Sequence, residues 1–266
     1  MTHAKAILFG EHSVVYGKLG ISIPLKEMTI DVEIDDNLGT TDDVIKNIFK
    51  LCNVSTNKKC IINSNIPIGK GLGSSAALAV EICNKLNISN TYEIATQSEE
   101  YVHGKSSGID LNQVMRNLPL KFIKNKSIEE FNFNLDTKLL IVDTNVIGST
   151  KEAVELVRKN YDINYKYIEE LGNISNQALN LLENKKLLQI GELMYIAHYY
   201  LNKIGVSDIS NNIIVNIAKR NNALGAKLTG AGMGGCCIVL CENEKFALSM
   251  KKIYKQEGYN SWIISI

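Results

Sequence analysis

Three glycines and two serines stand close together in residues 66–78, which read IPIGKGLGSSAAL. Glycines let the main chain turn sharply, and residues 74–86 carry the apolar spacing of a helix. Backbone N–H groups of such a loop and of the first helical turn can point at a phosphate group, and the helix dipole favours the same anion. Ser74 and Ser75 can cap the helix, hold a phosphate oxygen or ligate magnesium. The stretch therefore indicates an anion site, and a plain glycine turn with serine caps is the alternative.

Charged residues also flank a short apolar run near the start of the chain. Lys5 precedes residues 6–9, and Glu11 and His12 follow them after a glycine. This spacing places charged groups at both ends of one buried strand. Solvation of these groups at the ends of the strand is the simpler alternative, because most charged side chains are exposed.

A third group of ionisable residues begins on a predicted helix at residues 91–103. Glu99 and His103 are four residues apart and share one helix face, and Asp110 stands where the next helix would start. Asp110 is either an N-cap or a carboxylate that acts on a substrate hydroxyl beside a phosphate site. A zinc site is not expected, because no thiolate accompanies His12 and His103.

A second glycine loop lies towards the C-terminus, where residues 227–235 read KLTGAGMGG. Strand-like segments bound it on both sides. It is either a flexible turn or a second set of backbone donors that faces a ligand.

The segments that must position these residues alternate between strand-like and helix-like patterns. Strands are predicted at residues 4–9, 14–25, 28–34, 60–64, 120–124, 139–143, 226–229, 236–241 and 261–266. Helices are predicted at residues 42–52, 74–86, 91–103, 151–159, 165–183, 186–204, 210–222 and 245–257, with a short one that starts near Asp110. The mixture indicates an α+β chain.

Composition narrows the classes of partner. The 266 residues can form two compact lobes. Lys and Arg total 29 against 28 Asp and Glu, so the net charge of +1 gives no general attraction to nucleic acid or to an anionic membrane. The six cysteines include no Cys-x-x-Cys motif, which indicates reduced thiols and a cytoplasmic protein. No apolar run has the length of a membrane span or an export signal.

Taken in order, the three motifs resemble those of the GHMP family of small-molecule kinases, and most closely its branch that phosphorylates mevalonate. The matching blocks are AKAILFGEHSVVYG at residues 4–17, PIGKGLGSSAA at residues 67–77 and KLTGAGMGG at residues 227–235. A fourth block, DTNVIGSTKEAV at residues 143–154, resembles the segment that supplies a threonine to the active site of that branch.

The resemblance implies an α+β, two-lobed GHMP kinase fold. It places an N-terminal, ribosomal-protein-S5-domain-2-like lobe with the ATP-binding loop at residues 1–135, and a C-terminal, ferredoxin-like lobe at residues 136–266. Asp110 would take the proton from the attacking hydroxyl, and Lys5 would lower the pKa of that hydroxyl. Ser75, with Ser74 close by, and Glu99 would ligate Mg²⁺. ATP contacts are expected from Gly69, Lys70, Gly71, Leu72, Gly73, Ser74, Ser75 and Ala76. Substrate contacts are expected from Lys5, Glu11, His12, Asp110, Thr150, Gly230 and Ala231.

The implied function is phosphorylation of the 5-hydroxyl of mevalonate by ATP and Mg²⁺, which yields 5-phosphomevalonate and ADP on the route to isoprenoids. Mevalonate and ATP would be the partners, without nucleic acid or membrane, and a homodimer is compatible with the resemblance. The alternatives are another GHMP kinase, acting on phosphomevalonate or a sugar, and a non-catalytic ligand sensor of the same fold. Sugar kinases of the family generally carry an Asp-Tyr pair after Gly-Glu-His, whereas this chain has Ser13 and Val14. A pure sensor has no need of Lys5, Glu99 and Asp110 together.

Overall fold

The computed structural model describes residues 1–36, 39, 42–104, 107–131 and 134–266. Contacts divide the chain into two units, each folded from separate stretches of sequence. The first unit comprises residues 1–5, 24–68 and 72–117, and the second comprises residues 6–23, 69–71 and 118–266. The expected lobe boundary at residue 135 stays a prediction.

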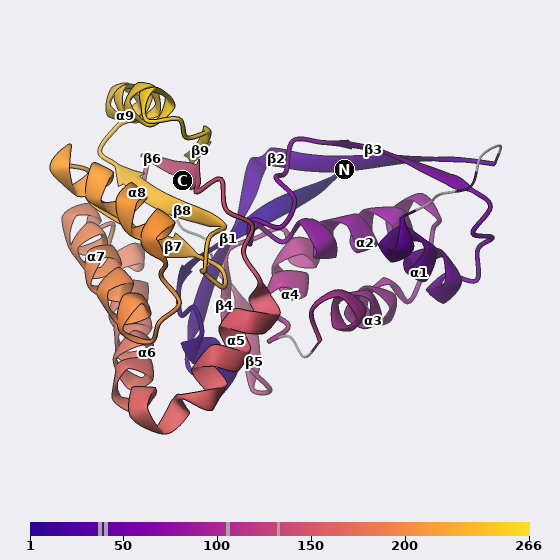
Figure 1. The fold of residues 1–266 in the computed structure, drawn as a ribbon, viewed down its shortest axis with the longest axis horizontal. Coiled ribbons are helices and arrows are strands. Elements are labelled where there is room, and N and C mark those ends of the chain that lie inside the picture. Colours follow the sequence, from indigo (N-terminus) through magenta and orange to yellow (C-terminus); the bar gives the residue numbers. More distant parts are fainter. Residues whose placement is uncertain (37–38, 40–41, 105–106, 132–133) are drawn as a thin grey trace. The chain divides into compact units, whose positions relative to one another are not determined.

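Helices and a long strand make up most of the first unit (Figure 1). Strand β2 (Gly20–Asp35) pairs antiparallel with β3 (Lys59–Ser64), and β1 (Thr2–Phe9) is also hydrogen-bonded to β2. The helices are α1 (Asp43–Leu51), α2 (Ser74–Lys85), α3 (Thr91–His103) and α4 (Ile109–Arg116). Helix α3 contacts α1 and α2, and α2 also contacts α4. The ends of α2, α3 and α4 carry the serines and acids singled out from the sequence.

Local sequence explains where these helices begin and how closely they pack. Asp42 caps α1, because its side chain accepts a hydrogen bond from the N–H of Ile45 at 3.0 Å. In α2, Ala76, Ala77 and Ala79 are all buried. Side chains of this size let neighbouring helices approach closely, so the first half of α2 is tightly packed against its neighbours.

An antiparallel sheet in the strand order β7-β8-β6-β9 organises much of the second unit. Its strands are β6 (Lys138–Asp143), β7 (Gly225–Thr229), β8 (Cys236–Cys241) and β9 (Ser261–Ser265). The helices of this unit are α5 (Thr150–Lys159), α6 (Tyr161–Glu183), α7 (Leu187–Lys203), α8 (Ile209–Arg220) and α9 (Glu244–Gln256). Helices α7 and α8 pack against β7, and α9 packs against β6 and β9 (Figure 1). The chain order of strand, helices, strand, strand, helix and strand, with this sheet order, is the expected ferredoxin-like arrangement.

Strands β6 and β8 form the centre of that sheet, and between its charged end residues β6 is wholly apolar. Every residue of β8 is buried, including Cys236, Cys237 and Cys241. Burial raises the pKa of Cys237 and Cys241 to about 12, so both thiols stay protonated and pack as small apolar groups. All six cysteines are free thiols, as predicted.

Three parts of the strand prediction are wrong. The pattern predicts extended chain over residues 14–25, but Ser13–Tyr16 forms the 3-10 helix η1, which ends at Gly17 with a φ of 75°. Strand β2 then continues without a break through the separate strand predicted at residues 28–34. Strand β5 (Ser127–Glu130) pairs with β4 (Leu120–Ile123) in a polar segment where no strand is expected; residues 132 and 133 of that segment lie outside the described part of the chain. Among the described residues, no helix is both long and apolar enough to cross a membrane.

Candidate active site

A buried lysine and a partly exposed aspartate form an ion pair in the first unit. Lys5 lies inside β1 with 1% of its side chain exposed, and its Nζ is 2.7 Å from Oδ1 of Asp110, whose side chain is 37% exposed. Asp110 stands in the first turn of α4, whose N-cap is Gly108, so the N-cap alternative is wrong. Solvation of Lys5 at the end of a strand is wrong as well. The pair joins a fixed cation to a carboxylate that still reaches solvent.

The glycine loop packs directly against this lysine. The N–H of Lys5 donates a hydrogen bond to the carbonyl of Leu72 at 3.0 Å. A Cβ on Gly73 would come within 3.0 Å of Cγ of Lys5, and Gly73 has a φ of 74°, so this position requires glycine. Gly73 is also the N-cap of α2, and no side chain caps that helix, so the predicted capping role of Ser74 and Ser75 is wrong.

Ser75 and Glu99 are the two predicted magnesium ligands, and both lie in the first unit. Ser75 Oγ and Glu99 Oε1 are buried and complete no hydrogen bond with the residues that the structure describes. Burial raises the pKa of Glu99; the nearby Ser75 hydroxyl lowers it, and Asp110 raises it further. The hydroxyl of Ser75 therefore lies close enough to the carboxylate of Glu99 to favour its charged form.

These two oxygen atoms suit a magnesium ion. Mg²⁺ prefers hard oxygen ligands, and proteins usually hold it through one or two carboxylates together with substrate phosphates. Two unpartnered buried oxygens, one of them from an acid, match that need. Within the described ranges, no group of three or more His, Cys, Asp and Glu side chains could hold a metal by itself. The donor set therefore fits an ion shared with a phosphate ligand.

The second unit contains another buried lysine. Lys227 in β7 and Glu11 form an ion pair in which both side chains are 0% exposed, and Lys227 Nζ also donates to the carbonyl of Leu228 at 2.8 Å. Burial lowers the pKa of Lys227, and the Glu11 carboxylate opposes this effect. The pair ties the segment after β1 to the strand that leads into the second glycine loop.

His12 makes a second tie between the same two segments. Its Nε2 lies 2.8 Å from the carbonyl oxygen of Ala231, so Nε2 carries the proton and donates the hydrogen bond. Burial lowers the pKa of His12 to about 4, and the imidazole is neutral at pH 7. His12 thus holds the glycine loop as a neutral donor.

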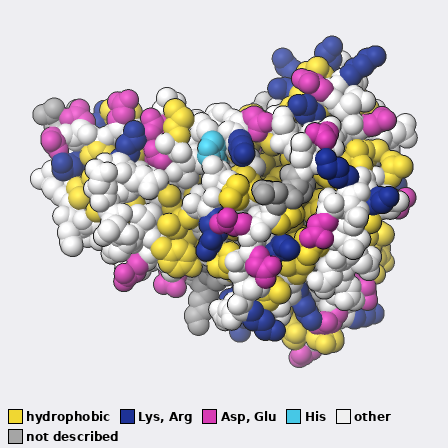
Figure 2. Space-filling model, turned by 180° about the vertical axis from the view of Figure 1, so that it is seen from behind, with side chains coloured by type: hydrophobic (Ala, Val, Ile, Leu, Met, Phe, Trp, Pro, Cys, Tyr) yellow, Lys and Arg dark blue, Asp and Glu magenta, His cyan; other side chains and the backbone are white. Residues whose placement is uncertain are grey.

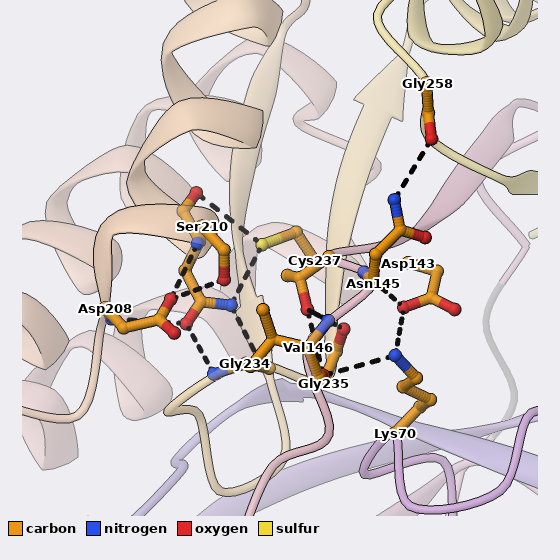
Figure 3. Close-up of polar contacts among 12 residues, drawn as sticks. Lys70, Asp143, Asn145, Val146, Asp208, Ser210, Gly234, Gly235, Cys237 and Gly258 are labelled. Carbon is orange, nitrogen blue, oxygen red and sulfur yellow. Dashed lines mark hydrogen bonds and ion pairs between the residues drawn. The ribbon is translucent and has the colours of Figure 1, made fainter.

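Three loops of the second unit enclose a small pocket. The loops approach through their main chains: a Cβ on Gly230 would lie 2.9 Å from the carbonyl oxygen of Gly71, and one on Gly148 would lie 2.9 Å from that of Gly232. Lys70 contributes an ammonium group, which pairs with Asp143 at 2.7 Å (Figure 3). The pocket is lined by Lys70, Gly71, Gly148, Thr150, Thr229, Ala231, Gly232 and Gly235.

The predicted site residues therefore fall into two groups, one in each unit. The group in the first unit comprises Lys5, Leu72, Gly73, Ser74, Ser75, Ala76, Glu99 and Asp110. The group in the second unit comprises Glu11, His12, Gly69, Lys70, Gly71, Thr150, Gly230 and Ala231. Within each group, the structure brings together residues that are far apart in the sequence.

Comparison with known proteins finds two domains of one family in this chain. Residues 40–115 match the GHMP kinases N terminal domain, and residues 178–260 match the domain described as GHMP kinases C terminal. The mevalonate kinase of Pyrococcus horikoshii is 32% identical over an alignment that covers 89% of this chain and 86% of that protein. The chain belongs to the GHMP kinase family. The mevalonate kinase of Thermococcus onnurineus is 33% identical, with 91% and 88% of the two chains covered.

Solved structures of the family have the same fold as this GHMP kinase. The Methanococcus jannaschii mevalonate kinase is 29% identical, with a TM-score of 0.79 over 100% of this chain and 97% of that chain. The L. major mevalonate kinase in complex with R-mevalonate has a TM-score of 0.86 at 23% identity, over 99% and 94% of the two chains. The family resemblance and the α+β fold with N- and C-terminal GHMP parts are confirmed.

Sequence reasoning about this GHMP kinase gave no role to two charged residues beside the site. Lys227 stands in the third motif, and Asp143 stands in the fourth block, yet neither was assigned a partner. Lys227 pairs with Glu11, which is 216 positions away in the sequence. Asp143, at the end of β6, pairs with Lys70 in the first glycine loop. The available signal was a single charge inside an otherwise apolar strand pattern, which predicts a buried partner of opposite sign.

Proposed function

We propose that this chain transfers the terminal phosphoryl group of ATP to the 5-hydroxyl of mevalonate, giving 5-phosphomevalonate and ADP on the route to isoprenoids. The observation that carries the proposal is the ion pair between buried Lys5 and solvent-reaching Asp110, packed against the glycine loop that precedes α2. Phosphoryl transfer needs positioning and charge neutralisation more than covalent chemistry, and this arrangement supplies both. The names of the relatives, mevalonate kinases, support the choice of substrate.

Asp110 is the general base in this proposal. Its carboxylate reaches solvent, so it can accept the proton of a bound hydroxyl. Lys5 lies 2.7 Å from that carboxylate, and its fixed positive charge lowers the pKa of the same hydroxyl. Both residues would contact the 5-hydroxyl of the substrate.

The phosphate groups of ATP are assigned to the glycine loop at residues 69–76 and to the backbone of Gly230 and Ala231. Positive φ angles at Gly69, Gly71 and Gly73 let the main chain turn towards a ligand. Ser75 and Glu99 would hold Mg²⁺ with their buried oxygens. When bound, the ion neutralises charge on the phosphates. Ser74 stands beside this pair as the alternative hydroxyl ligand.

Mevalonate contacts are assigned to His12 and Thr150, with Lys5 and Asp110 at the hydroxyl. His12 is neutral and holds Ala231, so it can orient the substrate without adding charge. Glu11 was expected to contact substrate, but its carboxylate is enclosed with Lys227. We therefore assign Glu11 a positioning role, in which it fixes His12 and the second glycine loop.

Small molecules are the proposed partners, and we expect no nucleic-acid ligand. The net charge is +1, and positive and negative side chains are interspersed on the face that Figure 2 shows. A cytoplasmic location is proposed because all six cysteines are free thiols. A homodimer is part of the proposal, and sedimentation of the purified chain would test it.

Release of ADP tests the function directly. Purified protein with Mg-ATP and mevalonate should release ADP well above a mevalonate-free control, and mass spectrometry should find one phosphate added to mevalonate. Phosphomevalonate and galactose, tested under the same conditions, should give only the background rate. Turnover with one of these acceptors instead of mevalonate would move the chain to another GHMP kinase activity. Nucleotide binding without turnover on the whole panel would indicate a sensor.

A further inference from the structure

Lys70 lies in the first glycine loop, and its ammonium group is held inside the second unit (Figure 3). Its Nζ lies 2.7 Å from Oδ1 of Asp143 and donates a hydrogen bond to the carbonyl of Val146 at 3.2 Å. The two charged side chains are 10% and 11% exposed. The N–H of Asn145 donates to the same Asp143 oxygen at 2.8 Å, which fixes the carboxylate.

The pocket of the three loops opens beside this lysine. Among the residues that the structure describes as lining the pocket, Lys70 carries the sole cationic side chain, and Thr150 and Thr229 carry hydroxyls. The other lining residues are glycines and one alanine, which present main chain. A lining of main-chain groups, hydroxyls and one ammonium fits a phosphoryl group rather than an apolar or cationic ligand.

The loop geometry does not require a lysine at this position. Gly69 and Gly71 on either side have φ angles of 71° and 75°, so glycine supplies the turn. Lysine adds a mobile charge on a flexible four-carbon stem. A phosphoryl group carries up to two negative charges and Asp143 carries one, so a phosphoryl group in the pocket would compete for the ammonium.

We infer that Lys70 and Asp143 form a latch that is released by nucleotide phosphate. Asp143 holds the ammonium in the nucleotide-free protein, and Lys70 transfers its ion pair to a phosphoryl oxygen when nucleotide binds. The inference rests on the proposed function, because it takes the glycine loop as the ATP site. Lys70 is then a charge-neutralising contact of the nucleotide, and Asp143 is a positioning residue that sets how tightly nucleotide binds.

A purely structural tie predicts something different. If the ion pair only fastened the loop to the end of β6, loss of either partner would disturb the loop in the same way. Both single variants would then change nucleotide affinity in the same direction. With a latch, loss of Lys70 weakens nucleotide binding and loss of Asp143 strengthens it. The sign of the two effects therefore separates the two interpretations.

Calorimetric titration of the full chain with ATP and ADP, at fixed Mg²⁺ and ionic strength, measures these effects. Lys70→Met should weaken ATP binding by about tenfold, and ADP binding by less, because a charged hydrogen bond is lost. Asp143→Asn keeps an oxygen for the N–H of Asn145 and should strengthen ATP binding by about threefold. The double variant should bind ATP like Lys70→Met alone.

Controls separate the latch from simpler effects. Lys70→Arg keeps the charge and should retain most of the affinity, and Lys185→Met removes a lysine from the exposed ion pair with Asp136 and should change nothing. Equal strengthening by Asp143→Asn in the presence and absence of Lys70 would mean simple repulsion by Asp143 and would overturn the latch. Weaker binding by Asp143→Asn would do the same. If Lys70→Met does not fold, Lys70→Gln takes its place in the single and double variants.

These affinities are measured without mevalonate, so they do not depend on the acceptor. The expected signs in a protein that fails to phosphorylate mevalonate would leave the latch in place and remove the proposed substrate. Mevalonate turnover with the wrong signs would leave the function in place and remove the latch.

Discussion

Two buried lysines, each paired with an acid, stand in different surroundings. Lys5 in the first unit is 1% exposed and pairs with Asp110, whose side chain is 37% exposed. Lys227 in the second unit is 0% exposed and pairs with Glu11, which is enclosed to the same degree. A carboxylate that reaches solvent can meet a substrate hydroxyl and take its proton, whereas an enclosed one can only hold its partner. Exposure of the acid, rather than the ion pair itself, therefore separates the pair that we propose to be reactive from the pair that holds the structure.

Replacement of Asp110 by asparagine tests the reactive side of this comparison. Asp110→Asn keeps an oxygen near Lys5 but removes the base, so turnover should fall by about 10³- to 10⁴-fold. Release of ADP with saturating mevalonate and ATP measures the loss. Circular dichroism should stay close to that of the parent protein and shows that the variant is folded, although the buried ammonium of Lys5 loses its counter-charge and the thermal midpoint falls. A loss of less than tenfold would remove Asp110 as the base.

The enclosed pair should respond in stability instead. Glu11→Gln leaves the buried ammonium of Lys227 without its counter-charge and should cost about 3 kcal/mol of unfolding free energy. Urea unfolding, followed by tryptophan fluorescence and circular dichroism, measures this loss. The double variant Glu11→Leu and Lys227→Met removes both charges and should recover most of the stability. The single variants Glu11→Leu and Lys227→Met complete the comparison. If the double variant loses as much unfolding free energy as these two single variants lose together, Glu11 and Lys227 are not coupled.

The same contrast shows what sequence reasoning can reach. The motifs singled out Lys5 and Asp110, and the structure pairs them at 2.7 Å, whereas their part in the reaction stays a prediction. The partner of Lys227 was missed, because it lies 216 residues away and no local pattern encodes so distant a contact. The capping roles expected of Ser74 and Ser75 also failed. Gly73, with a φ of 74°, occupies the N-cap because the loop packs on Lys5.

The secondary-structure predictions also succeed where local sequence signals suffice and fail where they do not. Helix α3 has the bounds predicted from its apolar spacing, Thr91–His103, because periodicity and turn residues are local signals. The 3-10 helix at Ser13–Tyr16 was predicted as extended chain, since Val14, Val15 and Tyr16 favour strands by composition. In the structure, the N–H groups of Val14 and Val15 donate hydrogen bonds to the carbonyls of Gly10 and His12, and these bonds stabilise the helical turn.

Replacement of Glu99 tests whether the unit that contains Lys5 and Asp110 also holds the metal ion. Glu99→Gln removes one buried anionic oxygen and should raise the Mg²⁺ concentration for half-maximal turnover by about tenfold or more. Ser75→Ala should have a smaller effect of the same kind. Ser98 is the matched control, because its hydroxyl is also buried without a partner among the described residues and it is adjacent to Glu99. A shift with Ser98→Ala as large as that with Glu99→Gln would argue against a specific ligand.

His12 belongs to the enclosed pair's unit, and its effect on stability is seen only as the pH falls. Its pKa is about 4 in the folded protein against an ordinary value of 6.5, so the unfolded chain takes up a proton first as the pH falls. Stability is therefore full above pH 6.5 and is lost between pH 6.5 and pH 4, by about 2 kcal/mol at pH 5 for this residue.

His198 shares the shift to about 4, so His12→Gln should remove about half of the histidine contribution and keep an N–H for Ala231. The raised pKa of Glu99 changes stability with pH in the opposite direction. This contribution is the same in the parent protein and in His12→Gln, so it cancels when the two are compared. Unfolding free energies at pH 7.5 and pH 5 for the parent and His12→Gln measure the effect. If the unfolding free energies of the parent protein and His12→Gln change with pH in parallel, His12 is not held neutral. The second unit would then be less enclosed around His12 than the Lys227–Glu11 pair indicates.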